Sequence, residues 1–394
     1  MSSLMVSLNP CVSEVLIQNI SSHYLISHGS FEDLFSIARK SRPKNIEEAL
    51  QRLNSSSQLT QPEYEAGRDI WLSAQDFTNG NDLELSITNF IEQITRKNVK
   101  DLFCVDRSRV HKRQSVFLTD DYAVKVFPRV EERFNKIAAE ISGLDIIRDL
   151  NLQEGKTTEF IAVGRCVING EDNLLLLMKR APGKTIKYYL DSIFTSPHRQ
   201  YALNECKLVL KQLGRLLGEI HSKKAVTYQG DFPGILEITF EKLKTQVAKS
   251  LQEYKTAGGA DLEVIAKFFE DILLRFDTKS FHLTISHNDA HLENFIFDAQ
   301  SGMTVIDTPR IHYTANADGE PLFSSYVHDV ARVEDDIAKC ILYHEVNEDL
   351  INELQKAFRN GYKEKAHKLI NTSQLFADKA WTILTRLRSV VPDR

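Results

Sequence analysis

The sequence predicts an α+β chain in which a helical N-terminal extension precedes a small β-rich lobe and a large helical lobe. A β-rich hairpin pattern at Ser115 to Phe127 and three strand-like runs between Phe160 and Met178 define the small lobe. Periodic apolar helices dominate the rest of the chain. We place the three parts at residues 1–100, 101–180 and 181–394. A chain of 394 residues suits this division, since a domain usually has roughly 100–200 residues.

The composition argues against several classes of protein. Hydrophobic residues make up 42% and charged residues 26%, with a net charge of −5 and no long basic run, so we expect no nucleic-acid partner. No stretch approaches the roughly 20 apolar residues of a membrane span, and the N-terminus lacks the pattern of a secretory signal. The five cysteines are scattered without a CxxC pair, which favours a reducing compartment such as a cytoplasm.

The extension is expected to be helical and without chemistry. Apolar residues at helical spacing predict an amphipathic helix at Asn81 to Lys97. A capping box at Ser30 to Asp33 predicts the start of another helix, and Ile46 to Leu53 has the pattern of a short third one. We expect this segment to have a packing or regulatory role.

The small lobe is expected to contain two strands, a helix and three further strands, with a tight turn at Asn169-Gly170. These elements are Ser115 to Thr119, Tyr122 to Phe127, the helix Val130 to Leu150, Phe160 to Val163, Cys166 to Ile168 and Leu174 to Met178. In the large lobe the expected helices are Leu213 to Ile220, Glu241 to Tyr254, Leu262 to Phe276, Glu348 to Phe358 and Leu375 to Leu387. A β-like island comprises Thr284 to Ser286, Phe295 to Phe297 and Met303 to Ile306.

The most informative segment runs from His287 to Asn294. Asp289 and Asn294 are five residues apart, and a second carboxylate, Asp307, ends an apolar strand-like run. This is the His-x-Asp-x-x-x-x-Asn and later Asp pattern of protein-kinase-like enzymes. Phosphoryl transfer needs a carboxylate near the attacking hydroxyl and hard oxygen ligands for Mg²⁺. We therefore predict Asp289 as the catalytic base, and Asn294 and Asp307 as the ligands of Mg²⁺.

A lysine stands in a strand that is otherwise apolar. Lys125 would be costly there unless it met an anion, and Glu140, on the predicted helix, can pair with it. Together they would hold the ammonium group against nucleotide phosphates. Alternatively, Lys125 snorkels from a strand end and Glu140 lies on a solvated helix face. Glu131 and Glu132 lie on the same predicted helix and are competing partners.

These motifs, in this order, resemble the aminoglycoside phosphotransferase and choline kinase family, small-molecule kinases with a protein-kinase-like fold. The resemblance runs from about Arg107 to about Ile337. It implies two lobes, ATP and Mg²⁺ as cofactors, and transfer of the γ-phosphate to a hydroxyl of a small molecule. It also implies that Asp329, at the start of a helix, braces the catalytic loop.

The run from Leu176 to Gly183 resembles the family's hinge between the lobes. The resemblance places Met178, Lys179 and Ala181 at the nucleotide, with backbone groups of the latter two meeting the adenine.

The chain departs from the family pattern at three points. No glycine-rich loop precedes Lys125, so Ser108 or Ser115 would have to serve there. The catalytic loop reads His-Asn-Asp, and without an arginine at its second position a phosphorylated activation loop has no obvious partner there. This favours an unregulated metabolite-type kinase. Thr308 replaces the usual aromatic residue after the metal ligand.

Two other functions stay open. A protein kinase, including one delivered to another cell, would label protein rather than metabolite, and the N-terminal extension motivates this alternative. A catalytically inactive nucleotide-binding module is motivated by the absent glycine-rich loop.

Several side chains also have alternative interpretations. His287 and His291 have the spacing of a zinc pair, but no His-Glu-x-x-His is present and a structural hydrogen bond of His287 is favoured. His221 is predicted to be a packed core histidine. The carboxylates at positions 334–336 either receive a cationic substrate or form a solvated helix face, and we favour the solvated face.

Overall fold

The computed structural model describes residues 31–40, 61–77, 82–105, 115–223, 225–229, 280–308, 326–345 and 347–366. Four predicted helices lie outside these ranges: Ile46 to Leu53, Glu241 to Tyr254, Leu262 to Phe276 and Leu375 to Leu387. The chain forms two compact units. Unit 1 comprises residues 1–41, 62–141 and 159–180, and unit 2 comprises residues 42–61, 142–158 and 181–394. No helix in the described part of the chain is long and apolar enough to cross a membrane.

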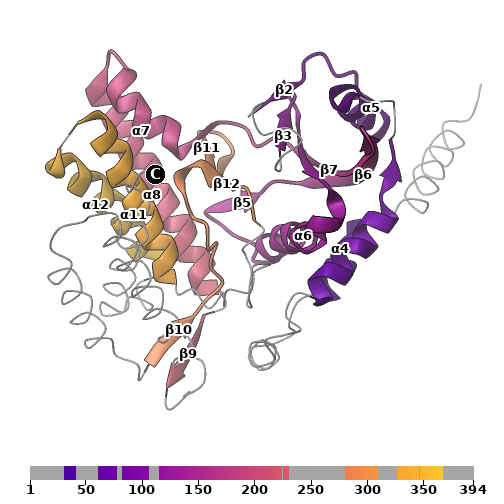
Figure 1. The fold of residues 1–394 in the computed structure, drawn as a ribbon. Helices are drawn as coiled ribbons and strands as arrows, with labels where there is room; N and C mark the ends of the chain where they lie inside the picture. Colours follow the sequence, from indigo (N-terminus) through magenta and orange to yellow (C-terminus); the bar gives the residue numbers. More distant parts are fainter. Residues whose placement is uncertain are drawn as a thin grey trace, which may run out of the picture. The chain divides into compact units, whose positions relative to one another are not determined.

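Unit 1 is built on a six-stranded sheet with the order β1-β6-β7-β4-β3-β2 (Figure 1). Its strands are β1 (Gln75–Asp76), β2 (Phe103–Cys104), β3 (Ser115–Leu118), β4 (Tyr122–Pro128), β6 (Phe160–Ile168) and β7 (Glu171–Lys179). All neighbouring strands are antiparallel except β1 and β6. The predicted hairpin is confirmed as β3 and β4. The turn at Asn169 and Gly170 is confirmed too, since both residues have positive φ, as a two-residue hairpin loop of type I′ requires.

The two predicted strands Phe160 to Val163 and Cys166 to Ile168 are in fact one strand, β6. Gly164 does not interrupt it, because the pairing with β7 continues through Gly164 and Arg165. The glycine is needed for packing instead: a Cβ atom at this position would lie 2.9 Å from the Phe77 ring. A sequence pattern cannot separate a glycine that breaks a strand from one that admits a ring.

The N-terminal extension is part of this sheet and its cover. Its described helices are α2 (Phe31–Lys40), α4 (Gln61–Ser73) and α5 (Leu83–Thr95). Helix α5 confirms the predicted amphipathic helix; the side chain of Asp82 caps its first turn, and Ile87 and Phe90 are fully buried with the apolar side chains of the strands. Strand β1 pairs in parallel with β6, where Asp76 and Arg165 form a bidentate ion pair.

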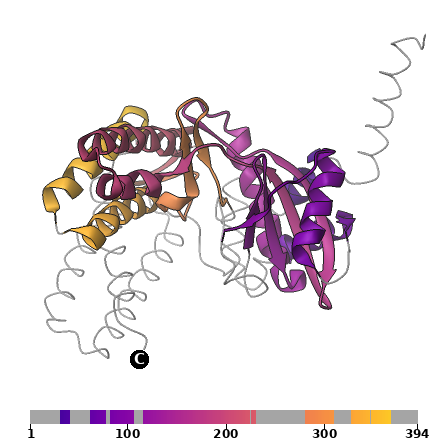
Figure 2. The same ribbon diagram turned by 90° about the horizontal axis from the view of Figure 1, so that it is seen from above.

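Helix α4 contacts the start of helix α6 (Phe134–Asp149), which follows the single 3₁₀ turn η2 (Val130–Arg133) (Figures 1 and 2). Tyr64 stands edge-on to Phe134, with ring centroids 5.1 Å apart. A Cβ atom at Gly67 would lie 1.8 Å from the Phe134 carbonyl oxygen, so only glycine permits this approach. The extension therefore supports the helix that carries Glu140.

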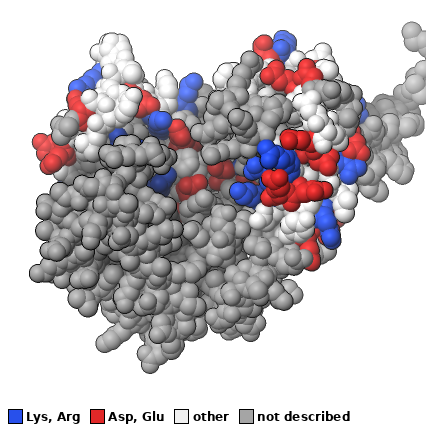
Figure 3. Space-filling view, viewed as in Figure 1, with Lys and Arg blue, Asp and Glu red and all other residues white. Residues whose placement is uncertain are grey.

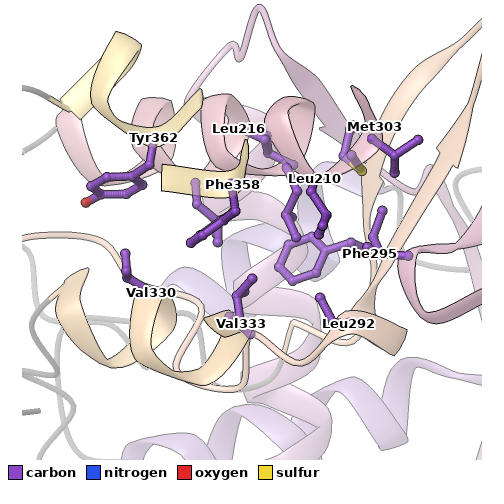
Figure 4. Close-up of a cluster of buried hydrophobic side chains, with 14 of the residues drawn as sticks. Leu210, Leu216, Leu292, Phe295, Met303, Val330, Val333, Phe358 and Tyr362 are labelled. Carbon is purple, nitrogen blue, oxygen red and sulfur yellow. The ribbon is translucent and has the colours of Figure 1, made fainter. Parts of the chain in front are cut away.

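Unit 2 packs helices around one apolar core (Figure 4). Its helices are α7 (Ile186–Thr195), α8 (Arg199–Lys223), α11 (Tyr326–His344) and α12 (Glu348–Ala366). Helices α8 and α12 cross closely, because a Cβ atom at Gly361 would lie 1.9 Å from the Lys211 carbonyl oxygen. The predicted helix Glu348 to Phe358 is two turns too short, since Tyr362 and Ala366 continue its buried stripe.

Two small sheets complete unit 2. One has the order β5-β12-β11-β8, and the other pairs β9 with β10. Their strands are β5 (Gly155–Thr157), β8 (Lys184–Thr185), β9 (Val226–Gln229), β10 (Ser280–Leu283), β11 (Phe295–Asp298) and β12 (Gly302–Val305). The predicted strand Thr284 to Ser286 is wrong. These residues are buried but pair with no strand in the described chain, and the hydroxyls of Thr284 and Ser286 bond to each other instead.

Candidate active site

The segment from His287 to Asn294 forms a tight, hydrogen-bonded turn before β11. The side-chain Nδ2 of Asn294 donates to the carbonyl of Asp289 at 2.9 Å, and the His291 amide donates to the same carbonyl at 2.7 Å. Asn294 is buried, whereas Asp289 is partly exposed. The five-residue spacing found in the sequence therefore allows the side chain of Asn294, the predicted metal ligand, to hold the backbone of Asp289, the predicted base.

Asp307 is tied to the same turn. Strands β11 and β12 pair antiparallel, and the Ile306 amide donates to the Asn294 carbonyl at 2.9 Å. Asn288 and Asp307 both have positive φ, at 61° and 56°. Asn and Asp tolerate this left-handed conformation best among residues other than glycine, and such conformations gather at functional sites. The structure thus brings Asp289, Asn294 and Asp307 together in unit 2.

Asp329 fixes the first two residues of this turn. It is fully buried at the start of α11, where its carboxylate accepts the amides of His287 at 2.6 Å and Asn288 at 2.8 Å. These are charge-assisted bonds to backbone groups, which fix the shape of the loop. The prediction that Asp329 braces the catalytic loop is confirmed.

His221 extends the brace. Its Nε2 lies 3.0 Å from the Asp329 carboxylate and its Nδ1 lies 2.9 Å from the hydroxyl of Tyr362. The prediction of a packed core histidine is right about its burial but missed this network. The partners lie 108 and 141 residues away in the sequence, so no local pattern signals the contact.

His287 is a structural residue. Its Nε2 lies 3.3 Å from the Ile306 carbonyl, which can only accept, so Nε2 carries the proton. Its buried Nδ1 has no hydrogen-bond partner among the described residues, and burial lowers the pKa of the ring. In the same part of the chain, no three carboxylate, thiol or imidazole side chains are grouped so that they could hold a metal ion.

In unit 1, Lys125 and Glu140 form a buried ion pair. Lys125 Nζ lies 2.5 Å from Glu140 Oε2, with exposures of 6% and 1%. The predicted pairing is confirmed, and the alternatives of a snorkelling lysine and a solvated glutamate are wrong. The competing residues Glu131 and Glu132 are exposed on η2.

The other predicted nucleotide residues also lie mainly in unit 1. Met178 and Lys179 end strand β7, and the Lys179 amide already donates to the carbonyl of Glu159 at 2.8 Å. Ser115 is buried at the start of β3, whereas Ser108 lies outside the described residues. Ala181 is the first residue of unit 2 after the strand.

The carboxylates at positions 334–336 are not a solvated face. Glu334 is buried and holds both arms of the Arg359 guanidinium. The Asp336 carboxylate accepts the amide of Leu292 at 3.2 Å. The favoured interpretation from the sequence is therefore wrong, since Glu334 joins helices α11 and α12, and Asp336 holds the segment that contains Leu292.

Two side chains of this segment carry oxygen atoms of the kind that hard cations prefer. Asn294 donates through its Nδ2 to Asp289, so its Oδ1 could act as a ligand, and Asp307 could supply a carboxylate oxygen. Mg²⁺ is usually held by one or two protein carboxyl or amide oxygens together with phosphates and water, so this donor set fits it.

A unit built on a β-sheet and a unit built mainly of helices are the parts expected of a kinase-like fold. A model of the phosphotransferase enzyme family matches residues 108–308, just over half of the chain. The chain therefore belongs to this family, as the resemblance of its motifs predicted, and it is a kinase.

Solved structures agree in fold. A glucosamine kinase is 12% identical with a TM-score of 0.51, and the match covers 78% of this chain and 82% of that one. The ADP-bound aminoglycoside phosphotransferase APH(2'')-Ib is 15% identical with a TM-score of 0.45, covering 79% and 92%. A comparison with curated proteins finds no match. At 12% identity the similarity to the glucosamine kinase concerns the fold alone, and it confirms the predicted kinase-like fold class.

Proposed function

We propose that the chain transfers the γ-phosphate of ATP to a hydroxyl of a small molecule, with Asp289 as the base. One observation carries this proposal. Hydrogen bonds through Asn294 join the backbone of Asp289 to that of Ile306, which precedes Asp307. These bonds would hold the base and the metal ligands in one constellation, as phosphoryl transfer requires. Membership of the phosphotransferase family supports the reaction class and a small acceptor.

The chemistry falls mainly on Asp289. Its partly exposed carboxylate would orient the acceptor hydroxyl and take its proton as the new oxygen–phosphorus bond forms and ADP leaves. Asn294 Oδ1 and the Asp307 carboxylate would hold Mg²⁺, which when bound neutralises charge on the phosphates. Asp329 and His221 would hold the loop without touching the reacting atoms.

Most of the residues that would hold the nucleotide lie in unit 1. Lys125, oriented by Glu140, would contact phosphates, Met178 would lie at the nucleotide, and backbone groups of Lys179 and Ala181 would meet the adenine. Ser108 or Ser115 would replace the glycine-rich loop.

The described cysteines are free thiols: Cys104, Cys166, Cys206 and Cys340. Burial raises the pKa of the Cys340 thiol to about 11, which makes this side chain a poor nucleophile. These thiols support a reducing compartment such as the cytoplasm. We infer no nucleic-acid partner, because charges of both signs are interspersed over the described surface in Figure 3.

The test is to replace Asp289 with Ala. We expect ATP-dependent phosphorylation of an acceptor panel to be lost while nucleotide binding, measured by calorimetry, is kept. Asp349→Ala, an exposed change on α12, is the matched control. The panel should include generic proteins, because labelled protein would indicate a protein kinase. Undiminished turnover in Asp289→Ala would refute the assigned role.

A further inference from the structure

A polar cavity opens beside the catalytic turn, entirely within unit 2. It has a volume of about 670 Å³, in the range of roughly 300–1,000 Å³ typical of small-molecule sites. Its walls are helix α7, the segment His291–Glu293 and helix α11. Of its lining residues, the sequence had pointed only to Asp336, as one of the carboxylates that could receive a cationic substrate.

The cavity lies close to the proposed base. His291, which lines it, is two residues from Asp289, so their Cα atoms are at most about 7 Å apart. The Leu292 amide donates to the carboxylate of Asp336, which ties the catalytic segment to the α11 wall. A sugar-sized molecule in the cavity could therefore present a hydroxyl to Asp289.

The charges of the lining are balanced. Three carboxylates face three cationic groups: Asp191, Glu293 and Asp336 against Lys187, Arg332 and Lys339. Lys187 Nζ lies 3.0 Å from Glu293 Oε1, and His344 Nε2 lies 3.7 Å from Asp191 Oδ1. The three basic groups would repel a polycation, and the three acidic groups would repel a polyanion. The lining therefore offers neither of them a net electrostatic attraction.

Two groups of the lining invite an uncharged polar molecule. Arg332 lines the cavity, where its guanidinium can donate hydrogen bonds to the oxygen atoms of a bound molecule. Tyr343 is 86% exposed at the lining, and its ring offers an apolar face. Hydroxyl groups both donate and accept, so one polyol can bond acidic and basic side chains together.

We infer that this cavity is the acceptor site and that the acceptor is an uncharged polyhydroxylated molecule, a neutral sugar or polyol, rather than a polycationic amino sugar. This inference rests on the proposed phosphotransfer at Asp289.

Binding to the full chain without nucleotide tests it separately from catalysis. Uncharged probes (D-glucose, D-ribose and myo-inositol) and a polycation (neomycin) are titrated by ligand-observed NMR. We expect at least one uncharged probe to bind, and neomycin to bind more weakly. Arg332→Gln should weaken that binding by about tenfold, as the loss of one hydrogen bond does. Arg215→Gln, whose ion pair with Glu364 lies on other helices, should not.

Lys339→Gln, at an exposed cavity residue, repeats the test if Arg332→Gln does not fold. Asp289→Asn should keep the binding while losing transfer. Retained binding without transfer in the wild type would refute the proposed function but not the site. Tighter binding of neomycin, or unchanged binding of the uncharged probes in both cavity variants, would overturn the inference.

Discussion

The buried charged side chains of the two units have different kinds of partner. In unit 2, the Asp329 carboxylate bonds two backbone amides and the ring of His221. In unit 1, the bond between Lys125 and Glu140 joins two side chains. The first arrangement determines the path of the chain. The second links two side chains, and a buried ion pair contributes little net stability compared with apolar residues of similar size.

The difference teaches where to look for function. A carboxylate that fixes backbone amides is explained by the fold it holds. A buried ion pair that adds little net stability is better explained by a function, and a lysine held ready for phosphates supplies one. Variants should therefore separate stability from activity in unit 1 and change both together in unit 2.

The largest effect is expected from Asp329→Ala. Two amides and His221 would lose a buried acceptor, so we expect the free energy of unfolding to fall by about 4 kcal/mol, with loss of transfer. Urea unfolding measures the change, with Asp349→Ala as the exposed control. A loss below about 1 kcal/mol would remove the contrast between the units.

The next effect concerns unit 1. Lys125→Met or Glu140→Met alone leaves one buried charge uncompensated, so each should destabilise the protein by about 3 kcal/mol. The double variant removes both charges and should return the stability to within about 1 kcal/mol of the wild type. If the double variant costs as much as the two single variants together, the pair is structural.

Close glycine contacts give a smaller effect. A Cβ atom at Gly143 would lie 1.9 Å from the Thr308 carbonyl oxygen, next to Asp307. Gly143→Ala should cost about 1–3 kcal/mol and lower transfer, because Thr308 must move. Gly67→Ala should cost a similar amount through α4. The control is Gly170→Asn, where nothing lies within 4 Å of the added Cβ and Asn tolerates the positive φ. Equal unfolding midpoints for all three variants would contradict the close contacts.

The smallest effect is a pH dependence through His287. Burial lowers the pKa of this ring below its usual 6.5, so the unfolded chain binds the proton more readily. Stability should be full above about pH 6.5 and should fall as the pH drops below it. His287→Gln should flatten this part of the profile in urea unfolding at several pH values. An unchanged slope would show that the ring is not held neutral.

The sequence predicted what depends on neighbours along the chain. The hairpin, the turn at Asn169-Gly170 and the spacing of Asp289 and Asn294 are local patterns, and the structure contains the first two as elements and the third as a hydrogen bond. The pair of Lys125 and Glu140 could be predicted because a charge in an apolar strand needs a partner of opposite charge, and the next helix along the chain offers one.

Contacts between distant elements could not be predicted in this way. The bond between His221 and Asp329 joins two helices, and Glu334 meets Arg359 on another helix. Since a helical carboxylate looks alike in sequence whether it is solvated or buried, tertiary packing alone decides its role. For the same reason the sequence could not show that Asp336 and His291 line one cavity.

The most direct test of the central claim is the rate of phosphate transfer from ATP by the double variant Lys125→Met/Glu140→Met. If the pair exists to hold nucleotide phosphates, the double variant should be as stable as the wild type yet transfer phosphate at least about a hundredfold more slowly, with weakened ATP binding. A stable double variant that transfers phosphate at the wild-type rate would contradict the claim.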